Sequence, residues 1–442
     1  MATRAIISRS RLLGIRSSSS LSGSSSSYEE NLRQRRELLS PGLISYYANP
    51  LYIVRGSRQW LWDHTGRKYL DMFGGICTVS VGHCHPKVNS ALAAQTVAHY
   101  QYLYEPGAAG VRQKVDGQTA SGAERLLFHQ QRLRGQRFGS ADGPAVHPAL
   151  EVVTLRNGYH GASPFLMGAT ALSTWRYATP TGFGFVNAAH PDPYRGEWGG
   201  AACRDSDAQP GRSCDCQQAG PAAFLAESIQ GVGGIVQFPR GYLSKAFSAV
   251  RAAGGLCISD EVQTGFGRLG SHYWGFEAHG VEPDIHRERV PLAAVVTSPE
   301  VARTLAEALH FNTFGGNPLA CAVGTAVLDV IDEEKLQENC QRVGQRLLSG
   351  LQRLRQSNQL IGDVRGKGLM VGVELVADRA SRAPLEAPRM ARLFEATREA
   401  GVLVGKGGFY GNVLRLQPPM CVTEADADAT VEAIGEAIKA AN

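Results

Sequence analysis

Three apolar runs that each end in polar residues constrain the fold of this 442-residue chain more than any other feature. They are EVVTLRNGYHG (residues 151–161), AAFLAESIQG (222–231) and GGLCISDEVQ (254–263). Runs of this kind, separated by helical stretches, are typical of parallel strands whose carboxyl ends meet at one edge of a sheet. We therefore expect Tyr159, Glu227 and Asp260 to face a common crevice.

This pattern predicts an α/β fold with two domains. The large domain should hold a mixed, mostly parallel sheet with helices on both faces, and the smaller domain should be of the α+β type. A long amphipathic helix from Leu328 to about Arg355 should connect them, because its apolar positions keep helical spacing. In residues 57–86, apolar and polar residues alternate between glycine turns, which predicts a short antiparallel hairpin. A helix should follow from Pro86 to about Tyr104.

The final helix should begin near Thr423, after short strands bounded by glycine. The chain then divides into four expected parts. They are a transit peptide at residues 1–27, an N-terminal segment at 28–90 that packs with the small domain, a large domain at 91–330 and a small domain at 331–442.

Charge and composition exclude some classes of partner. The net charge of +5 is small for this length, and no run of Lys or Arg is dense enough to follow a phosphate backbone. No apolar stretch reaches the length of a membrane span. Neither nucleic acid nor a bilayer is therefore expected as a partner.

The first 27 residues differ from the rest of the chain. They are rich in arginine and serine, and no acid precedes Glu29. This composition is typical of an organelle transit peptide, and a long uncharged core of the secretory kind is missing. We expect a mitochondrial address, with the plastid as second choice and a serine-rich tail without an address as the alternative.

The nine cysteines are dispersed, so a disulfide framework is not expected in a reducing compartment. Cys203, Cys214 and Cys216 cluster in one loop, but no fourth ligand stands at a usual spacing. A surface loop is therefore favoured over a zinc site, and no metal is expected.

Asp260 is the candidate around which a site can be built. A carboxylate at the end of a buried strand is costly unless a cation meets it. One such cation is a protonated pyridine nitrogen, which a protein acid holds charged so that the ring can act as an electron sink. The alternative is a helix cap or a surface salt bridge.

Three further residues offer groups that suit a planar, phosphorylated cofactor. Tyr159 follows a strand and a glycine, so its ring could lie over such a cofactor, or it could be a core aromatic. Thr313, in an Asn-Thr-Phe-Gly-Gly loop, offers a hydroxyl and open backbone amides for a phosphate. Arg415 is a cation on an apolar strand, suited either to a substrate carboxylate or to an internal ion pair.

Taken together, several strings resemble the class III aminotransferases of the fold-type I pyridoxal-phosphate superfamily. The resemblance covers roughly residues 40–105 and 149–440. It is carried by YLDMFGGICTVSVGHCHP, NGYHGASP, AESIQGVGG, ISDEVQTGFGRLGSHYWGFEAHGVEPDI, HFNTFGGNPLACA, GDVRGKGLMVGVEL and LRLQPPM. HPDPYRGEWGG (residues 190–200) and the GKGGFYGN turn point to the alanine:glyoxylate branch over the ornithine and 4-aminobutyrate branches.

The resemblance implies a role for each candidate. Asp260 would pair with the ring nitrogen of pyridoxal phosphate, with Gln263 beside the ring hydroxyl and Tyr159 stacked on the ring. His160, in the same NGYHG string, would belong to the cofactor-binding set. Thr313 would reach the phosphate from a neighbouring subunit, which implies a homodimer. Glu227 and Arg415 would line the pocket for the amino acid and 2-oxo acid substrates.

The chain departs from this family at three places. Ser228 stands where the family has proline in E-P-I-Q-G, a change expected to be mild. A phosphate-cup motif like NSGSEAND is missing, and residues 107–148 stand in its place. The Schiff-base lysine, in a string like VTMAKGIGNGFP, is missing as well, because no lysine occurs between Lys245 and Lys335.

The genetic code offers an explanation for the two larger departures. Codons for residues 128–144, read one nucleotide later, permit FINSGSEANDLAVLMAR, and HRERV (residues 286–290) likewise permits IGNGF. We hypothesise that both segments are out-of-frame translations from a faulty gene model, and that the second segment also lacks the codons for the lysine. We expect residues 107–148 to be poorly packed. The chain with this sequence should then lack transaminase activity and retain the cofactor weakly. A non-catalytic, dimerising homologue and another class III aminotransferase are the alternatives.

Overall fold

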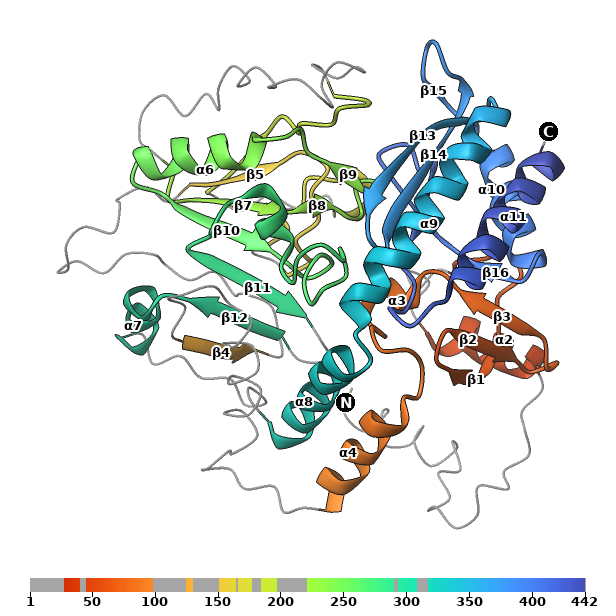
Figure 1. Ribbon diagram of the computed structural model, residues 1–442, viewed down its shortest axis with the longest axis horizontal. Coiled ribbons are helices and arrows are strands. Elements are labelled where there is room, and N and C mark those ends of the chain that lie inside the picture. The colour runs from red at the N-terminus through yellow and green to blue at the C-terminus, as the bar shows by residue number, and fades with distance from the viewer. Residues whose placement is uncertain are drawn as a thin grey trace, which may run out of the picture. The chain divides into compact units, whose positions relative to one another are not determined.

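A seven-stranded mixed sheet forms the centre of the larger part of the protein (Figure 1). The computed structural model describes residues 28–39, 45–97, 125–129, 151–163, 166–176, 184–196, 221–289, 293–307 and 317–441. The strand order is β4-β12-β11-β10-β7-β5-β6. The bounds are β4 (Arg125–His129), β5 (Val152–Leu155), β6 (Phe185–Ala188), β7 (Ala223–Glu227), β10 (Leu256–Asp260), β11 (Ile285–Arg289) and β12 (Ala293–Thr297).

The three apolar runs become the three adjacent parallel strands β5, β7 and β10, as predicted. Every residue of β7 is buried, which explains why its sequence is apolar without alternation. Phe224 and Ala226 pack on one face of the sheet with helix α6 (Tyr242–Ala252), whereas Ala223 and Leu225 pack on the other with Ile258 and Ile285. The chain is therefore an α/β protein with a mixed sheet.

Two strands of this sheet had no signal in the sequence. β4 lies within residues 107–148 and pairs antiparallel with β12. The rest of that segment lies outside the described residues. β11 is formed by the HRER string, and it runs parallel to β10 and antiparallel to β12. Both strands lie on the β12 side of β10.

Smaller sheets hold the remaining strands. The predicted N-terminal hairpin is confirmed as β2 and β3, and β1 adds a further antiparallel strand ahead of it. β3 pairs in parallel with β16 from the C-terminal part of the chain. A second sheet has the order β13-β14-β18-β17, with β15 added to β14, and β8 pairs with β9. The bounds are β1 (Ile53–Ser57), β2 (Trp60–Asp63), β3 (Lys68–Asp71), β8 (Ile229–Gln230), β9 (Val236–Gln237), β13 (Ile361–Lys367), β14 (Met370–Asp378), β15 (Ala383–Pro384), β16 (Val402–Leu403), β17 (Gly405–Gly407) and β18 (Val413–Leu416).

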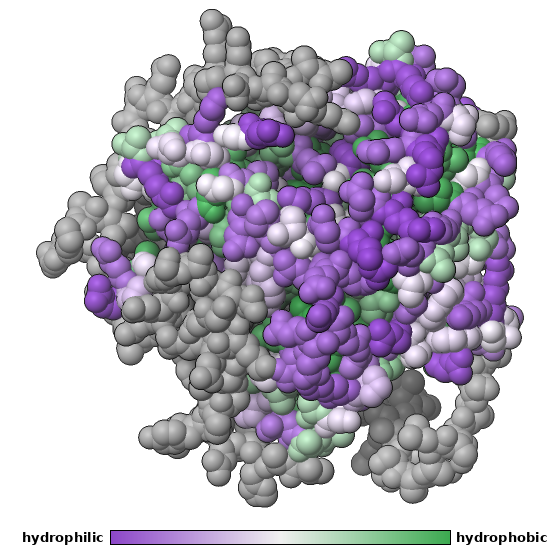
Figure 2. Space-filling view, viewed as in Figure 1, coloured by the Kyte–Doolittle hydropathy of each residue, from purple (hydrophilic) through white to green (hydrophobic). Residues whose placement is uncertain are grey.

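The long connecting helix is interrupted, contrary to prediction. α8 (Pro318–Glu333) ends before Lys335, whose φ of 51° lies in the left-handed region, and α9 (Leu336–Ser357) begins after it. α9 packs on β13 and β14, and Figure 2 shows the largely hydrophilic surface over this helix. The other helices are α3 (Gly74–Cys77), α4 (Pro86–Val97), η1 (Ser173–Trp175), η3 (Gly275–His279), α7 (Pro299–Glu307), α10 (Ala387–Glu399) and α11 (Glu424–Ala441).

Two of these helices match expected boundaries. α4 begins at Pro86, and the part of the expected helix beyond Val97 lies outside the described residues. α11 begins one residue after Thr423, whose hydroxyl accepts a hydrogen bond from the backbone N–H of Asp426 (3.2 Å). Among the described residues, no helix has both the length and the apolar character needed to cross a membrane.

The described residues before Ile53 form a unit of their own. Its helix α2 (Tyr28–Leu38) has no buried residue. The Tyr28 hydroxyl donates to the carbonyl of Pro50 (2.7 Å), and Arg33 forms ion pairs with Glu30 and Glu37.

Candidate functional site

Three charged residues form a row across the carboxyl ends of neighbouring strands. Asp260, the last residue of β10, is in register with Glu227 of β7 on one side and with Arg287 of β11 on the other. In-register residues of parallel strands point to the same face of a sheet. This is the face on which Leu225, Ile258 and Ile285 pack, so the row continues that apolar layer at the edge of the sheet.

Asp260 is buried, with an exposed fraction of 3%, and its carboxylate has two strong partners. Oδ2 lies 2.8 Å from Nδ1 of His160 and forms an ion pair with Nη2 of Arg287. Burial alone would raise the pKa of Asp260, but the charge of Arg287 and the hydrogen bond from His160 hold it well below its usual range. Asp260 is therefore a carboxylate whose charge is balanced from within the chain.

Glu227 lies beside this pair and is held by backbone groups. Its carboxylate accepts hydrogen bonds from the N–H of Tyr159 (3.1 Å) and the N–H of Gly231 (2.8 Å). Burial raises the pKa of Glu227, and the negative charge of Asp260 acts in the same direction. Tyr159, Glu227 and Asp260 thus lie together at one edge of the sheet, linked through His160, whereas the crevice that they were expected to face stays a prediction.

The ring of Tyr159 contacts an aromatic residue that sequence reasoning did not select. Its centroid lies 5.8 Å from that of Trp175, with the two rings 69° apart. Such an edge-to-face contact fixes the orientation of both rings. Trp175 is 49% exposed, so this contact lies at the surface side of the site.

Gln263 and Arg415 form a second group. Oε1 of Gln263 accepts hydrogen bonds from Nη2 of Arg415 (3.1 Å) and from Nε2 of Gln417 (2.8 Å). Nη2 of Arg415 also donates to Oε1 of Gln417 (2.7 Å), and its guanidinium lies 5.4 Å from the ring centroid of Phe73. The structure therefore joins two residues that were predicted for separate roles, and Arg415 is buried and bonded to amide oxygens.

Glu261 and Ser228 explain how the site tolerates one departure from the family. Glu261 is buried and accepts hydrogen bonds from the hydroxyls of Ser228, Ser259 and Thr264 and from the N–H groups of Gly275 and Phe276. Ser228 thus adds a donor to a buried carboxylate where a proline would offer none. This contact is consistent with the expected mildness of the change.

Several predictions fall outside the described residues. Thr313 is one of them, and the cysteine loop around Cys203, Cys214 and Cys216 is another. Within the described part of the chain, no group of three or more His, Cys, Asp or Glu side chains is placed to hold a metal ion.

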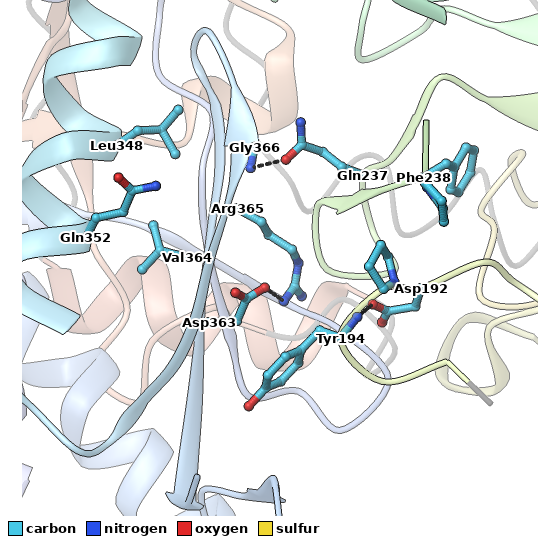
Figure 3. A pocket seen from close by; sticks show the side chains of 12 residues that line it. Asp192, Tyr194, Gln237, Phe238, Leu348, Gln352, Asp363, Val364, Arg365 and Gly366 are labelled. Atoms are coloured by element: carbon cyan, nitrogen blue, oxygen red, sulfur yellow. Dashed lines mark hydrogen bonds and ion pairs between the residues drawn. The ribbon is translucent and has the colours of Figure 1, made fainter. Parts of the chain in front are cut away.

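A cavity of about 270 Å³ opens away from these candidates, between α9, β13 and the HPDPYRG segment (Figure 3). On one side, Arg365 forms an ion pair with Asp363 (3.1 Å), and the N–H of Gly366 donates to Oε1 of Gln237 (2.8 Å). On the other side, Asp192 accepts a hydrogen bond from the N–H of Tyr194 (2.8 Å). None of the candidate site residues lines this cavity.

The comparison with known proteins defines the class. A family model described as Aminotransferase class-III matches residues 45–106 and 108–438. The chain belongs to the class III aminotransferases, which use pyridoxal phosphate.

Three relatives show how much of the chain this covers. Mitochondrial alanine–glyoxylate aminotransferase 2 of Homo sapiens is 41% identical, over 93% of this chain and 86% of that protein. Mitochondrial alanine–glyoxylate aminotransferase 2 homolog 2 of Arabidopsis thaliana is 42% identical, over 91% and 86%. An amine transaminase from an uncultivated Pseudomonas species, solved in its PLP-bound internal aldimine form, superimposes with a TM-score of 0.78 at 29% identity, over 92% and 99%.

The residues of this chain do not fit a covalently held pyridoxal phosphate. Residues 246–334 contain no lysine. Asp260, which the family resemblance assigns to the protonated ring nitrogen, already forms an ion pair with Arg287. Arg287 belongs to the HRERV segment, and sequence reasoning missed its role because the segment was treated as an anomaly. Ile285 and Arg287 fall on the same face of β11, but the residue of β10 that each one faces depends on strand register, which the structure alone gives.

Proposed function

We propose that the parent activity of this chain is amino transfer from alanine to glyoxylate, giving pyruvate and glycine, and that the chain with this sequence does not catalyse it. The observation that carries the first part is the group of Asp260, His160 and Glu227, all buried, with the half-buried Tyr159 beside them at the carboxyl edge of the sheet. It is supported by the names of the two relatives at 41% and 42% identity. The HPDPYRG motif favours this substrate pair over ornithine or 4-aminobutyrate.

The second part rests on chemistry that the chain cannot supply. Transamination needs an amine that holds the cofactor and then moves a proton between substrate carbon and cofactor. No lysine stands in residues 246–334 to provide it. Arg415 is bonded to Gln263 and Gln417, so it would hold a substrate carboxylate only after these bonds opened.

The test is direct. The purified full-length chain is expected to produce no pyruvate from alanine and glyoxylate above the background of free pyridoxal phosphate. After mixing with the cofactor and borohydride, it should carry no covalently fixed chromophore on a peptide from residues 246–334. The human relative serves as positive control. Steady turnover by the chain itself would refute the proposal.

We propose that residues 107–148 and 286–290 are out-of-frame translations from a faulty gene model, and that the second segment also lacks the codons for the lysine. Sequencing the messenger around these codons tests this, because a transcript that encodes the residues as written would exclude it. We further propose that residues 1–27 direct the protein to mitochondria, as the names of both relatives suggest. A fluorescent protein fused to these residues should then accumulate in mitochondria and not in plastids.

A non-catalytic protein that pairs with an active relative remains the second candidate. The observation that favours it is the ion pair between Asp260 and Arg287, which neutralises the buried carboxylate when no cofactor is bound. Co-purification with an active relative, without turnover by the chain alone, would favour this candidate.

A further inference from the structure

We propose that Arg287 is a built-in counter-ion for Asp260, which takes the place that the family gives to the protonated ring nitrogen and leaves the chain with little affinity for a pyridinium ring. This inference rests on the proposed function, because it assumes that Asp260 is the cofactor's acid. The inference goes beyond that function, because it makes the Arg287–Asp260 ion pair a second obstacle to binding the cofactor, besides the missing lysine.

The position of Arg287 follows from the sheet. β10 and β11 are parallel neighbours, and Asp260 and Arg287 are paired in register. Their side chains therefore leave the same face of the sheet at adjacent points, where they form an ion pair. Nη2 of Arg287 also donates to the carbonyl of His160 (3.1 Å), which ties the guanidinium to the loop after β5.

Burial makes this contact matter. The side chains of Arg287 and Asp260 are 12% and 3% exposed, so neither charge is well hydrated. Removing one partner of such a pair leaves a buried charge uncompensated, whereas removing both is much less costly. A buried pair of this kind should therefore oppose the binding of a second cation to Asp260.

Both oxygens of Asp260 already have donors. Oδ2 is shared by His160 and Arg287, and Oδ1 accepts a long hydrogen bond from the N–H of Val262 (3.3 Å). A pyridinium nitrogen that approached Oδ2 would have to displace the guanidinium. The displaced cation of Arg287 would then stand in a half-buried site near the positive ring, which is unfavourable.

The experiment uses pyridoxine 5′-phosphate, which has the ring and the phosphate but no aldehyde. Its binding to the full-length chain therefore reports on recognition of the ring and is independent of lysine chemistry. Arg287→Gln is expected to bind the probe at least about tenfold more tightly than the native chain in equilibrium dialysis. Adding Asp260→Asn to that variant should abolish the gain.

Arg251→Gln is the matched control, because it removes the same charge from a more exposed pair with Asp284 (3.1 Å) away from the site. It should bind the probe as the native chain does. Equal binding by the native chain and Arg287→Gln would overturn the proposal, as would a gain that persists in the double variant.

Stability gives an independent readout should Arg287→Gln fold poorly. Its Tm should fall by several degrees more than that of Arg251→Gln, because Asp260 is left buried with one partner fewer. The double variant Asp260→Asn/Arg287→Gln should recover most of that loss. A double variant at least as unstable as Arg287→Gln would overturn the counter-ion role. Alanine–glyoxylate turnover by the native chain would refute the proposed function alone, since the probe cannot be transaminated.

Discussion

Asp192 shows how one residue of the HPDPYRG motif depends on its surroundings. Burial would raise the pKa of its carboxyl group, but His190, the charge of Arg365 and backbone N–H groups lower it to about 2. A carboxyl group whose pKa is lowered by folding stabilises the folded state above its unfolded pKa. That contribution is lost as the pH falls through the folded pKa.

Asp192→Asn is therefore expected to lower the free energy of unfolding by about 2 kcal/mol at neutral pH. The difference from the native chain should shrink between about pH 4 and pH 2, where the native carboxylate takes up its proton. Urea unfolding at a series of pH values measures this. Asp428→Asn, which changes a surface ion pair with Arg346, should show a much smaller pH dependence. Parallel curves for Asp192→Asn and the native chain would contradict the prediction.

The sequence could predict the residues that end buried strands, but not their partners. Glu227 and Asp260 were found because a polar residue after an apolar run must lie at a sheet edge. Arg287 was not found, because a side-chain contact between β10 and β11 depends on strand register, which a string of five residues does not reveal. Similarly, the contact between Gln263 and Arg415 joins residues 152 positions apart.

At the scale of elements, helical spacing predicted the faces of α8 and α9 but not the break between them. A helix that changes direction keeps its apolar period on both sides, so the pattern alone cannot show the turn. The turn residue, Lys335, has a φ of 51°, a conformation that glycine adopts readily and other residues adopt at a cost. β4 was missed for a different reason, because it lies inside a segment without strand alternation.

Lys335→Gly should therefore stabilise the protein by up to about 1 kcal/mol, since it removes the strain of the left-handed conformation. Urea unfolding of the native and variant chains measures the change. Gln345→Gly, at an exposed position inside α9, is the control and should cost about 1 kcal/mol, because glycine is a poor helix former. A loss of stability in Lys335→Gly as large as in the control would show that the left-handed turn carries no strain.

At the scale of the whole molecule, the fold was predictable because sequence motifs that resemble those of the class III aminotransferases are distributed over most of the chain. The division into a large and a small domain at residue 330 stays a prediction. The pairing of β3 with β16 joins residues 70–71 to residues 402–403, a contact between distant parts of the chain that local patterns could not indicate.

The homodimer belongs to this scale as well. We propose it because the family resemblance assigns Thr313 to the site of a neighbouring subunit. Sedimentation of the purified chain should give twice the mass of one chain at micromolar concentration. A monomer over the same range would exclude a shared site, and it would also weaken the role proposed for Thr313.

The row of Glu227, Asp260 and Arg287 has a consequence for how β11 finds its place. If β11 slid by one residue along β10, its side chains would turn to opposite faces, and Arg287 would point away from Asp260. Either His286 or Glu288 would then stand across from that carboxylate. The attraction between Asp260 and Arg287 therefore favours a single register of β11 on β10. A short and polar strand can in this way add to an apolar sheet in one position.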